Sequence, residues 1–210
     1  MAAAFEVTSR LFESGRTLII RPAEDEDANA LFEHLCEEFG EPNRIEQDSD
    51  GNIYIMPPPG GEASHQNADV LAQLQLWSKT DKRGVAFDSS VMFVLPNRAK
   101  RSPDGSWVSL QRLKALPREE RRQFLKLVPE FVIEIKPPSD RWPELQNKML
   151  EYRDNGVLLG WLIHPEKQIV LVYRYGCEDV EVVRGSQIVG EGPVSGFVLD
   201  LEAVWKGLDF

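Results

Sequence analysis

The hexapeptide Phe131-Val132-Ile133-Glu134-Ile135-Lys136 constrains the fold more than any other stretch of the chain. Its apolar members favour β-structure, so the segment predicts a buried strand. Side chains alternate between the two faces of a strand, which puts Glu134 and Lys136 on one face, roughly 7 Å apart. Burying a carboxylate and an ammonium is costly unless partners compensate. The segment is therefore a candidate active-site strand.

Helical and strand patterns alternate on both sides of this hexapeptide. Apolar residues at helical spacing predict helices over 25–39, 62–79 and 139–155. Strand patterns cover 17–21, a hairpin at 44–56, one or two strands over 84–95, a strand around 107–108, a hairpin at 158–175, 178–183 and 197–201. Residues 117–127 are charged and predict a helix or a surface excursion. This order predicts an α/β fold with one mixed sheet flanked by helices, within a single domain over residues 1–210.

Charge and composition limit the classes of function. The net charge of −10 argues against a generic nucleic-acid binder, whose surface is usually basic. The middle third nevertheless carries many Lys and Arg between residues 79 and 126, which either form a local basic groove or lie on ordinary solvated faces. Two cysteines exclude a disulfide framework and a zinc cluster. With no long apolar stretch and no signal-peptide pattern, we expect no membrane association and a cytoplasmic location.

Asp104 and the two charged residues of the hexapeptide have a common chemical use. Two carboxylates, Asp104 and Glu134, can hold Mg²⁺ or Mn²⁺, which prefer oxygen ligands. Such a cation polarises a phosphodiester, and Lys136 can position the attacking water. The alternative is a structural ion pair at a sheet edge.

The segments around these residues resemble a known family. Pro103-Asp104 with Glu134-Ile135-Lys136 resembles the PD-(D/E)XK nuclease signature. The wider matches are at 56–65, 102–104, 129–140, 145–152 and 156–163, and they resemble the bacterial Uma family of restriction endonucleases. The resemblance spans residues 44–201, which leaves 1–40 as an N-terminal helical extension to a nuclease core over 41–210.

The resemblance implies a restriction-endonuclease-like core and a metal-dependent endonuclease with DNA as the expected substrate. It also implies that Glu62, at the start of its helix, faces the same site and adds a third metal ligand; capping of that helix is the alternative. We favour Lys136 as the catalytic lysine. Lys148 lies beside the inward stripe of the following helix, where it either extends along the core edge or reaches the site as an auxiliary group.

Two other functions are compatible with the same residues. The acidic net charge would suit a catalytically inactive binding or assembly module that keeps the fold. A smaller phosphate ester could also replace nucleic acid as the substrate. A homodimer is plausible for the endonuclease, since a two-fold assembly serves to cut both strands of a duplex.

Overall fold

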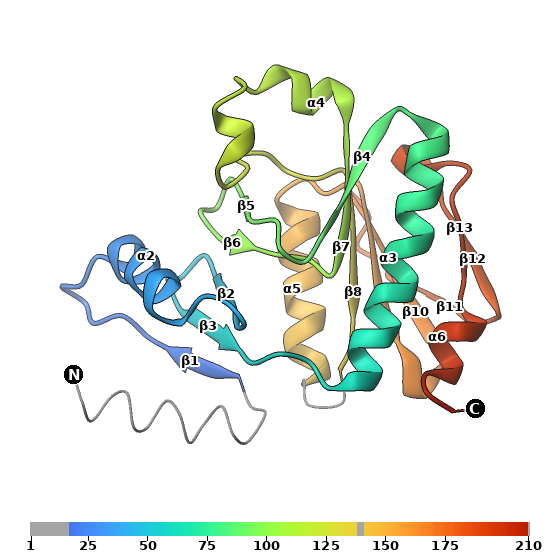
Figure 1. Cartoon of the computed structure of the whole chain (residues 1–210), viewed down its shortest axis with the longest axis horizontal. Coiled ribbons are helices and arrows are strands. Elements are labelled where there is room, and N and C mark those ends of the chain that lie inside the picture. The colour runs from blue at the N-terminus through green and yellow to red at the C-terminus, as the bar shows by residue number, and fades with distance from the viewer. Residues whose placement is uncertain (1–16, 138–140, 210) are drawn as a thin grey trace.

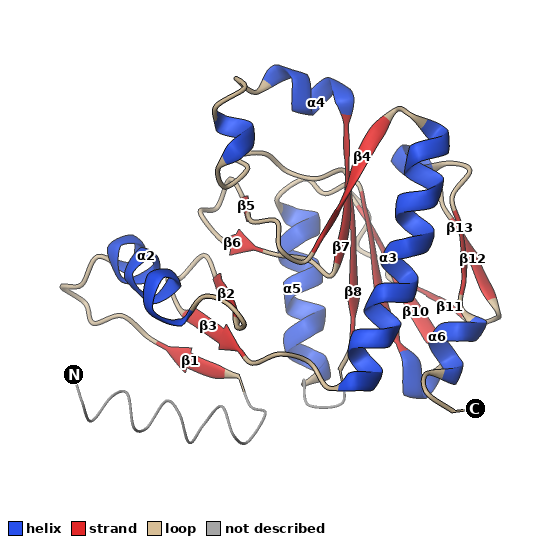
Figure 2. Ribbon diagram, in the orientation of Figure 1, coloured by secondary structure: helices blue, strands red, loops and turns tan. Residues whose placement is uncertain are grey.

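A mixed sheet forms the centre of the larger part of the molecule (Figures 1 and 2). The computed structural model describes residues 17–137 and 141–209. The sheet has the order β11-β10-β9-β8-β7-β4, with bounds Glu181–Val183, Ile169–Arg174, Leu159–His164, Phe131–Ile135, Gly105–Ser109 and Gly84–Asp88. Strands β8 and β9 are parallel and the other neighbours are antiparallel. The predicted mixed sheet of an α/β fold is confirmed.

Helices cover both faces of this sheet (Figure 1). Helix α3 (Gly61–Asp81) packs on one face together with α6 (Glu202–Lys206) and the hairpin β12–β13 (Gln187–Val189 and Val198–Asp200). Helix α5 (Trp142–Asp154) packs on the other face. In β8, Phe131 and Ile133 join the core under α3, whereas Val132 joins the core under α5. The alternation therefore puts Glu134 on the α5 face.

A second, smaller sheet lies beside this core at the N-terminal end of the described chain (Figure 1). Its order is β1-β3-β2-β6-β5, with bounds Leu18–Ile20, Ile53–Met56, Arg44–Gln47, Lys100–Arg101 and Phe93–Val94. The predicted hairpin at 44–56 is confirmed as β2 and β3. Helix α2 (Ala28–Phe39) packs on this sheet through Phe32 and Leu35. Asp27 caps it by accepting hydrogen bonds from the Asn29 and Ala30 amides.

The structure departs from the expectation of one sheet, because the 84–95 pattern gives two strands, β4 and β5, that belong to different sheets. The charged stretch 117–127 is the surface excursion of the two alternatives, with one 3₁₀ turn, Glu120–Arg122, after the short helix α4 (Leu110–Ala115). Strand β8 ends at Ile135: the Lys136 amide still donates to the Ile163 carbonyl (2.9 Å), but Pro137 has no amide to continue the ladder.

None of the helices in residues 17–137 and 141–209 combines the length and the apolar character that crossing a membrane requires.

Gly84, the first residue of β4, lies where no side chain fits. A Cβ atom there would collide with the Trp107 indole and the Val108 carbonyl. We expect Gly84→Ala to destabilise the fold by ~1–3 kcal/mol, since the backbone must shift. Gly61→Ala is the control, because a Cβ at that first position of α3 meets nothing within 4 Å. Thermal unfolding should lower the Tm of the first variant only, and equal Tm values would contradict this packing.

Candidate active site

Asp104 and Glu134 lie near the ends of two neighbouring interior strands of the central sheet, β7 and β8. Asp104 immediately precedes β7, and the register of β7 with β8 pairs Gly105 with Ile133. Asp104 Oδ2 accepts a hydrogen bond from the Ile135 amide at 2.8 Å. Both carboxylates are buried, with 8% of Asp104 and 1% of Glu134 exposed. Antiparallel pairing thus brings together the two carboxylates that the sequence nominated.

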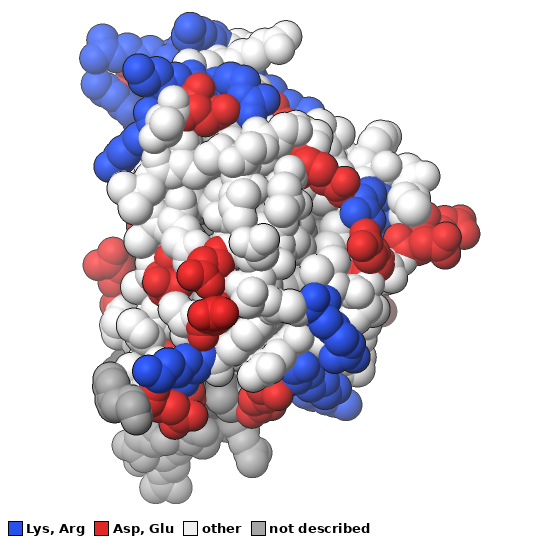
Figure 3. All heavy atoms as spheres, turned by 90° about the vertical axis from the view of Figure 1, so that its right-hand side faces the viewer, with Lys and Arg blue, Asp and Glu red and all other residues white. Residues whose placement is uncertain are grey.

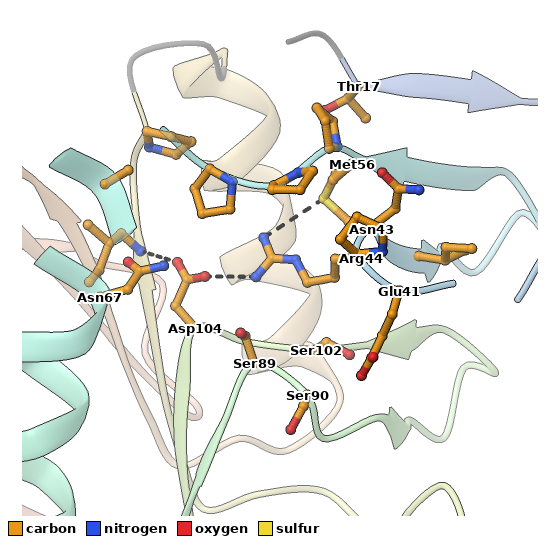
Figure 4. A pocket seen from close by; sticks show the side chains of 18 of the residues that line it. Thr17, Glu41, Asn43, Arg44, Met56, Asn67, Ser89, Ser90, Ser102 and Asp104 are labelled. Atoms are coloured by element: carbon orange, nitrogen blue, oxygen red, sulfur yellow. Dashed lines mark hydrogen bonds and ion pairs between the residues drawn. The ribbon is translucent and has the colours of Figure 1, made fainter. Parts of the chain in front are cut away.

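A cavity of about 910 Å³ opens at these carboxylates, between the small sheet and the core (Figure 4). Its wall includes Asp104 and Glu134, the loop 57–60 and the first turns of α3. The charged side chains in the wall are Glu41, Arg44, Glu62, Asp104 and Glu134. The cavity is thus an acidic recess with a single basic side chain among its described lining residues.

Lys148 connects Glu134 to a carboxylate that the sequence analysis did not nominate, Glu46. The Lys148 Nζ lies 2.7 Å from Glu134 Oε1 and 2.8 Å from Glu46 Oε1. Tyr152, one turn further along α5, donates its hydroxyl to Glu134 Oε1 at 3.0 Å. Lys148 does not line the cavity, since it lies behind Glu134 with its side chain 9% exposed.

Glu46 lies at the centre of a buried network of charges. Arg101 Nη1 is 3.3 Å from Glu46 Oε2, and the Ser102 amide donates to Glu46 Oε1 at 3.1 Å. Arg101 also pairs with Glu151 of α5 through a 2.6 Å contact. The network therefore joins the small sheet, which carries Glu46 and Arg101, to the helix that supports Glu134.

The two carboxylates that contact Lys148 have opposite pKa shifts. Burial raises the pKa of Glu134 to about 7, because Lys148 only partly offsets it and the charges of Asp104 and Glu46 oppose ionisation. Burial also opposes ionisation of Glu46, but Lys148, Arg44 and Arg101 together lower its pKa to about 2. Glu134 has one close cation that favours its ionised form, whereas Glu46 has three. Glu46 is therefore the carboxylate that is held ionised.

Arg44 of β2 contacts Asp104 in the wall of the cavity (Figure 4). Its Nη1 lies 2.7 Å from Asp104 Oδ1, and its Nη2 lies 3.8 Å from the sulfur of Met56. The pKa of Arg44 is raised, since the charges of Asp104, Glu46 and Glu134 outweigh the effect of burial. Each carboxylate that the sequence nominated on the sheet thus has its own cationic partner, Arg44 for Asp104 and Lys148 for Glu134.

Glu62 lines the cavity but does not point towards Asp104. It is exposed, and its carboxylate lies against Gly207 after α6, so that a Cβ on Gly207 would collide with it. On the same face of α3, Gln66 donates to the Val204 carbonyl at 2.9 Å. The face of α3 that turns to the cavity carries Asn67 instead, and Figure 4 shows its side chain beside Asp104.

Lys136 follows the last residue of β8, and its side chain is not part of the cavity wall. Its Nζ donates to the Pro137 carbonyl at 2.9 Å. After burial, the charge of Lys136 is the next cause of the lowered pKa of His164, at the end of β9. The lysine in contact with Glu134 is Lys148 of α5, rather than Lys136, which lies two residues after Glu134 in the sequence.

Asp104 and Glu134 fit a cation that keeps most of its water ligands. Mg²⁺ is commonly bound through one or two carboxylates, with water and substrate oxygens completing the octahedron. Each carboxylate already lies 2.7 Å from a positive group, Arg44 for Asp104 and Lys148 for Glu134, so both carboxylates are oriented to bind cations. Among residues 17–137 and 141–209, no group of three or more His, Cys, Asp or Glu side chains is arranged to hold a metal ion.

Four residues of the site were missed in the sequence: Arg44, Glu46, Asn67 and Tyr152. Arg44 and Glu46 share one face of a predicted strand, and two opposite charges on such a face are the same signal that singled out Glu134 and Lys136. Asn67 lies one turn before Val70 on the apolar stripe of its helix, which would have indicated its inward direction. Tyr152 lies four residues after Lys148, on the same face of α5.

We expect Glu46→Gln to destabilise the protein at neutral pH by about 3 kcal/mol, because it leaves the charge of Lys148 and Arg101 undercompensated. The pKa of Glu46 lies below its ordinary value of 4.5, so its contribution to stability is full above that value. The contribution is lost as the pH falls from 4.5 towards about 2. Urea unfolding across this range should show the difference between wild type and variant shrinking with acidity.

Glu119→Gln is the control for this measurement. The Glu119 carboxylate is 76% exposed and lies 3.6 Å from Arg122, so its loss should change stability little at any pH. A pH-independent difference for Glu46→Gln would contradict the ionised state assigned to Glu46.

Comparison with known proteins agrees with this architecture. The family model of Uma2, described as "Putative restriction endonuclease", matches residues 30–202. A solved structure, a "putative nuclease belonging to DUF820" from Anabaena variabilis, has a similar fold, with a TM-score of 0.65 and 24% sequence identity over 77% of this chain and 89% of that one. No curated relative matches. Since the family match covers most of the chain and includes both sheet carboxylates, the protein belongs to the Uma2 family of restriction-endonuclease-like proteins.

Proposed function

We propose that the protein is a metal-dependent endonuclease that hydrolyses phosphodiester bonds of nucleic acid, with DNA as its substrate and Mg²⁺ or Mn²⁺ as its cofactor. The observation that carries the proposal is the meeting of Asp104 and Glu134 in the wall of one cavity. The description of the family, "Putative restriction endonuclease", supports the same class of reaction.

In the proposed site, Asp104 and Glu134 hold the metal ion. The ion, when bound, supplies the charge that polarises the phosphodiester and lowers the pKa of a water. Glu62 is not included among the ligands, because its carboxylate lies against Gly207. Asn67 is placed to hold a water or a substrate oxygen through its amide, beside Asp104 (Figure 4).

Lys148 is a positioning residue in this proposal. Its Nζ contacts Glu134 at 2.7 Å, but it does not line the cavity, so it acts on the substrate through Glu134. It favours the ionised form of a carboxylate whose pKa burial raises, and Tyr152 fixes the same oxygen from the other side. Contact with Glu134 makes Lys148, rather than Lys136, the lysine on which the activity depends.

A basic surface segment supports nucleic acid as the substrate. The chain that connects the end of β7 to the start of β8 has exposed cations at Lys114, Arg118, Arg121, Arg122 and Lys126. It joins the two strands at the ends opposite to Asp104 and Glu134. Figure 3 shows Lys and Arg gathered at that end of the molecule. Phe124 of the same segment lines the cavity. A polyanion can therefore meet cations there although the net charge is −10.

A catalytically inactive binding module is the second candidate. It is favoured by one observation, which is that both carboxylates already have cationic partners from the protein, Arg44 and Lys148. In such a module these ion pairs would be purely structural. Metal binding separates the two candidates, since only the nuclease needs the carboxylates to accept a metal ion.

We expect Asp104→Asn and Glu134→Gln each to reduce Mn²⁺-dependent cleavage of a DNA duplex by at least about 100-fold, because each removes a charged metal ligand without changing the side chain's shape. The measurement is the cleavage rate on labelled linear and supercoiled DNA. Asp154→Asn is the control, because that carboxylate is 63% exposed on the far end of α5 and should leave the rate unchanged. Cleavage that survives both site variants, or its absence with DNA and RNA across both metals, would exclude the proposed reaction.

Comparing Lys148→Met with Lys136→Met tests the choice of lysine. Loss of Lys148 leaves Glu134 without its close cation, so we expect the rate to fall by about 10- to 100-fold, as for other groups that orient metal ligands. Lys148→Arg should restore part of the rate if the charge beside Glu134 is what matters. Lys136→Met should have a small effect, and the opposite order would assign the role to Lys136.

A further inference from the structure

We propose that Arg44 binds a phosphate oxygen of the substrate, and that its ion pair with Asp104 is the resting state that a divalent cation displaces. The proposal rests on the metal-dependent activity proposed above. It adds a residue from the small sheet to the substrate site, and it predicts competition between Arg44 and the metal ion.

Arg44 is the only Lys or Arg among the described residues that line the cavity. Four carboxylates share the wall with it, at Glu41, Glu62, Asp104 and Glu134. A phosphodiester that enters this acidic recess needs a cationic partner there besides the metal. Lys148 cannot be that partner, because it lies behind Glu134 and outside the wall.

The guanidinium of Arg44 has donor capacity left for an oxyanion. Its Nη1 donates to Asp104, whereas its Nη2 contacts only the sulfur of Met56 among the described residues, at 3.8 Å. A thioether is a weak acceptor, so a phosphate oxygen is a far better partner for that nitrogen. The Arg44 side chain is 29% exposed, whereas the other charged side chains of the network are 14% exposed or less, and Arg44 lines the cavity.

Each Asp104 oxygen accepts one hydrogen bond, Oδ2 from the Ile135 amide and Oδ1 from Arg44, and keeps a second lone pair that can bind a metal ion. A divalent cation on Oδ1 would lie close to the Arg44 guanidinium, and the two positive charges would repel each other. The amide belongs to the strand that positions Glu134 and cannot move away, whereas a partly exposed arginine can change rotamer. A metal ion on Oδ1 would therefore release Arg44 into the cavity.

The backbone of Arg44 stays fixed during this change. Arg44 pairs with Met56 in the β2–β3 ladder, and the next residues pair in register. Only the side chain has to reorient, over the short distance between Asp104 and an oxyanion beside it. The same residue thus neutralises Asp104 before a metal ion binds and contacts the substrate afterwards.

The first test is Mn²⁺ binding without nucleic acid, measured by titration calorimetry on wild type, Arg44→Ala and Arg174→Ala. Arg174 is the matched control, because its side chain is 35% exposed and pairs with Glu181 at 2.6 Å, away from the site. We expect Arg44→Ala to bind Mn²⁺ about 5-fold or more tightly than wild type, a typical size for coupling between competing ligands. Unchanged or weaker binding by Arg44→Ala would overturn the competition.

The second test is the kinetics of DNA cleavage in Mn²⁺. Without Arg44 a charge-assisted contact to phosphate is lost, so KM for a DNA duplex should rise about 10-fold or more, with Arg44→Lys between the two. Arg174→Ala should match wild type. An Arg44→Ala variant with the wild-type KM would show that Arg44 does not contact the substrate.

The effect of DNA on the affinity for Mn²⁺ is a third test, and it can be measured on the wild-type protein. If phosphate holds Arg44 away from Asp104, a DNA duplex should tighten Mn²⁺ binding in wild type. The effect should be smaller in Arg44→Lys, which keeps the charge. If the ion pair were purely structural, Arg44→Ala would instead have a lower Tm and a lower affinity for Mn²⁺ than wild type.

The outcomes separate this inference from the proposed function. If neither wild type nor Arg44→Ala binds Mn²⁺, the proposed function fails together with this inference. If wild type binds Mn²⁺ and cleaves DNA but Arg44→Ala gains no affinity, only the inference fails.

Discussion

The two contacts of Lys148, to Glu46 and to Glu134, hold the site and the fold together. Glu46 belongs to the small sheet, Glu134 to the central sheet, and Lys148 to the helix between them. Each of these charges would be expensive to bury alone, by several kcal/mol. Because each compensates another, the small sheet is held against the core by the same ions that set the charge of the active site.

This arrangement makes stability and site chemistry inseparable. Arg101 connects Glu46 to Glu151 on α5, and Arg44 connects Asp104 to β2 of the small sheet. A substitution that removes one charge therefore leaves its partner buried and unpaired, which affects both Tm and activity. Variants that keep the shape of the side chain, with an unfolding measurement beside each rate, are what separates the two effects.

The strand alternation in 131–136 was enough to find Glu134, and the pairing of β7 with β8 explains why Asp104 lies beside it. The pattern could not reveal Arg44 and Glu46 as partners, because they reach the site from another sheet, and no local period encodes the packing of two sheets. It also suggested Lys136, because alternation puts Lys136 on the same face as Glu134, but it could not show that the Lys136 side chain lies outside the cavity wall. The sequence showed Lys148 only as a lysine beside the inward stripe of its helix. Its contacts with Glu46 and Glu134 depend on tertiary packing, which the stripe does not encode.

The two faces of α3 explain why the proposed metal site has two carboxylates instead of three. Ala63 and Asn67 line the cavity, and Val70 and Leu74 continue that face into the core. The face of Glu62 turns to the C-terminal segment, where Gln66 and Gln73 bond to backbone groups of α6 and β13. Since these contacts fix the rotation of the helix, Glu62 cannot turn to Asp104 without breaking them. Any cation held by Asp104 and Glu134 must then complete its shell with water and substrate oxygens, which leaves open coordination positions for the phosphate beside Arg44.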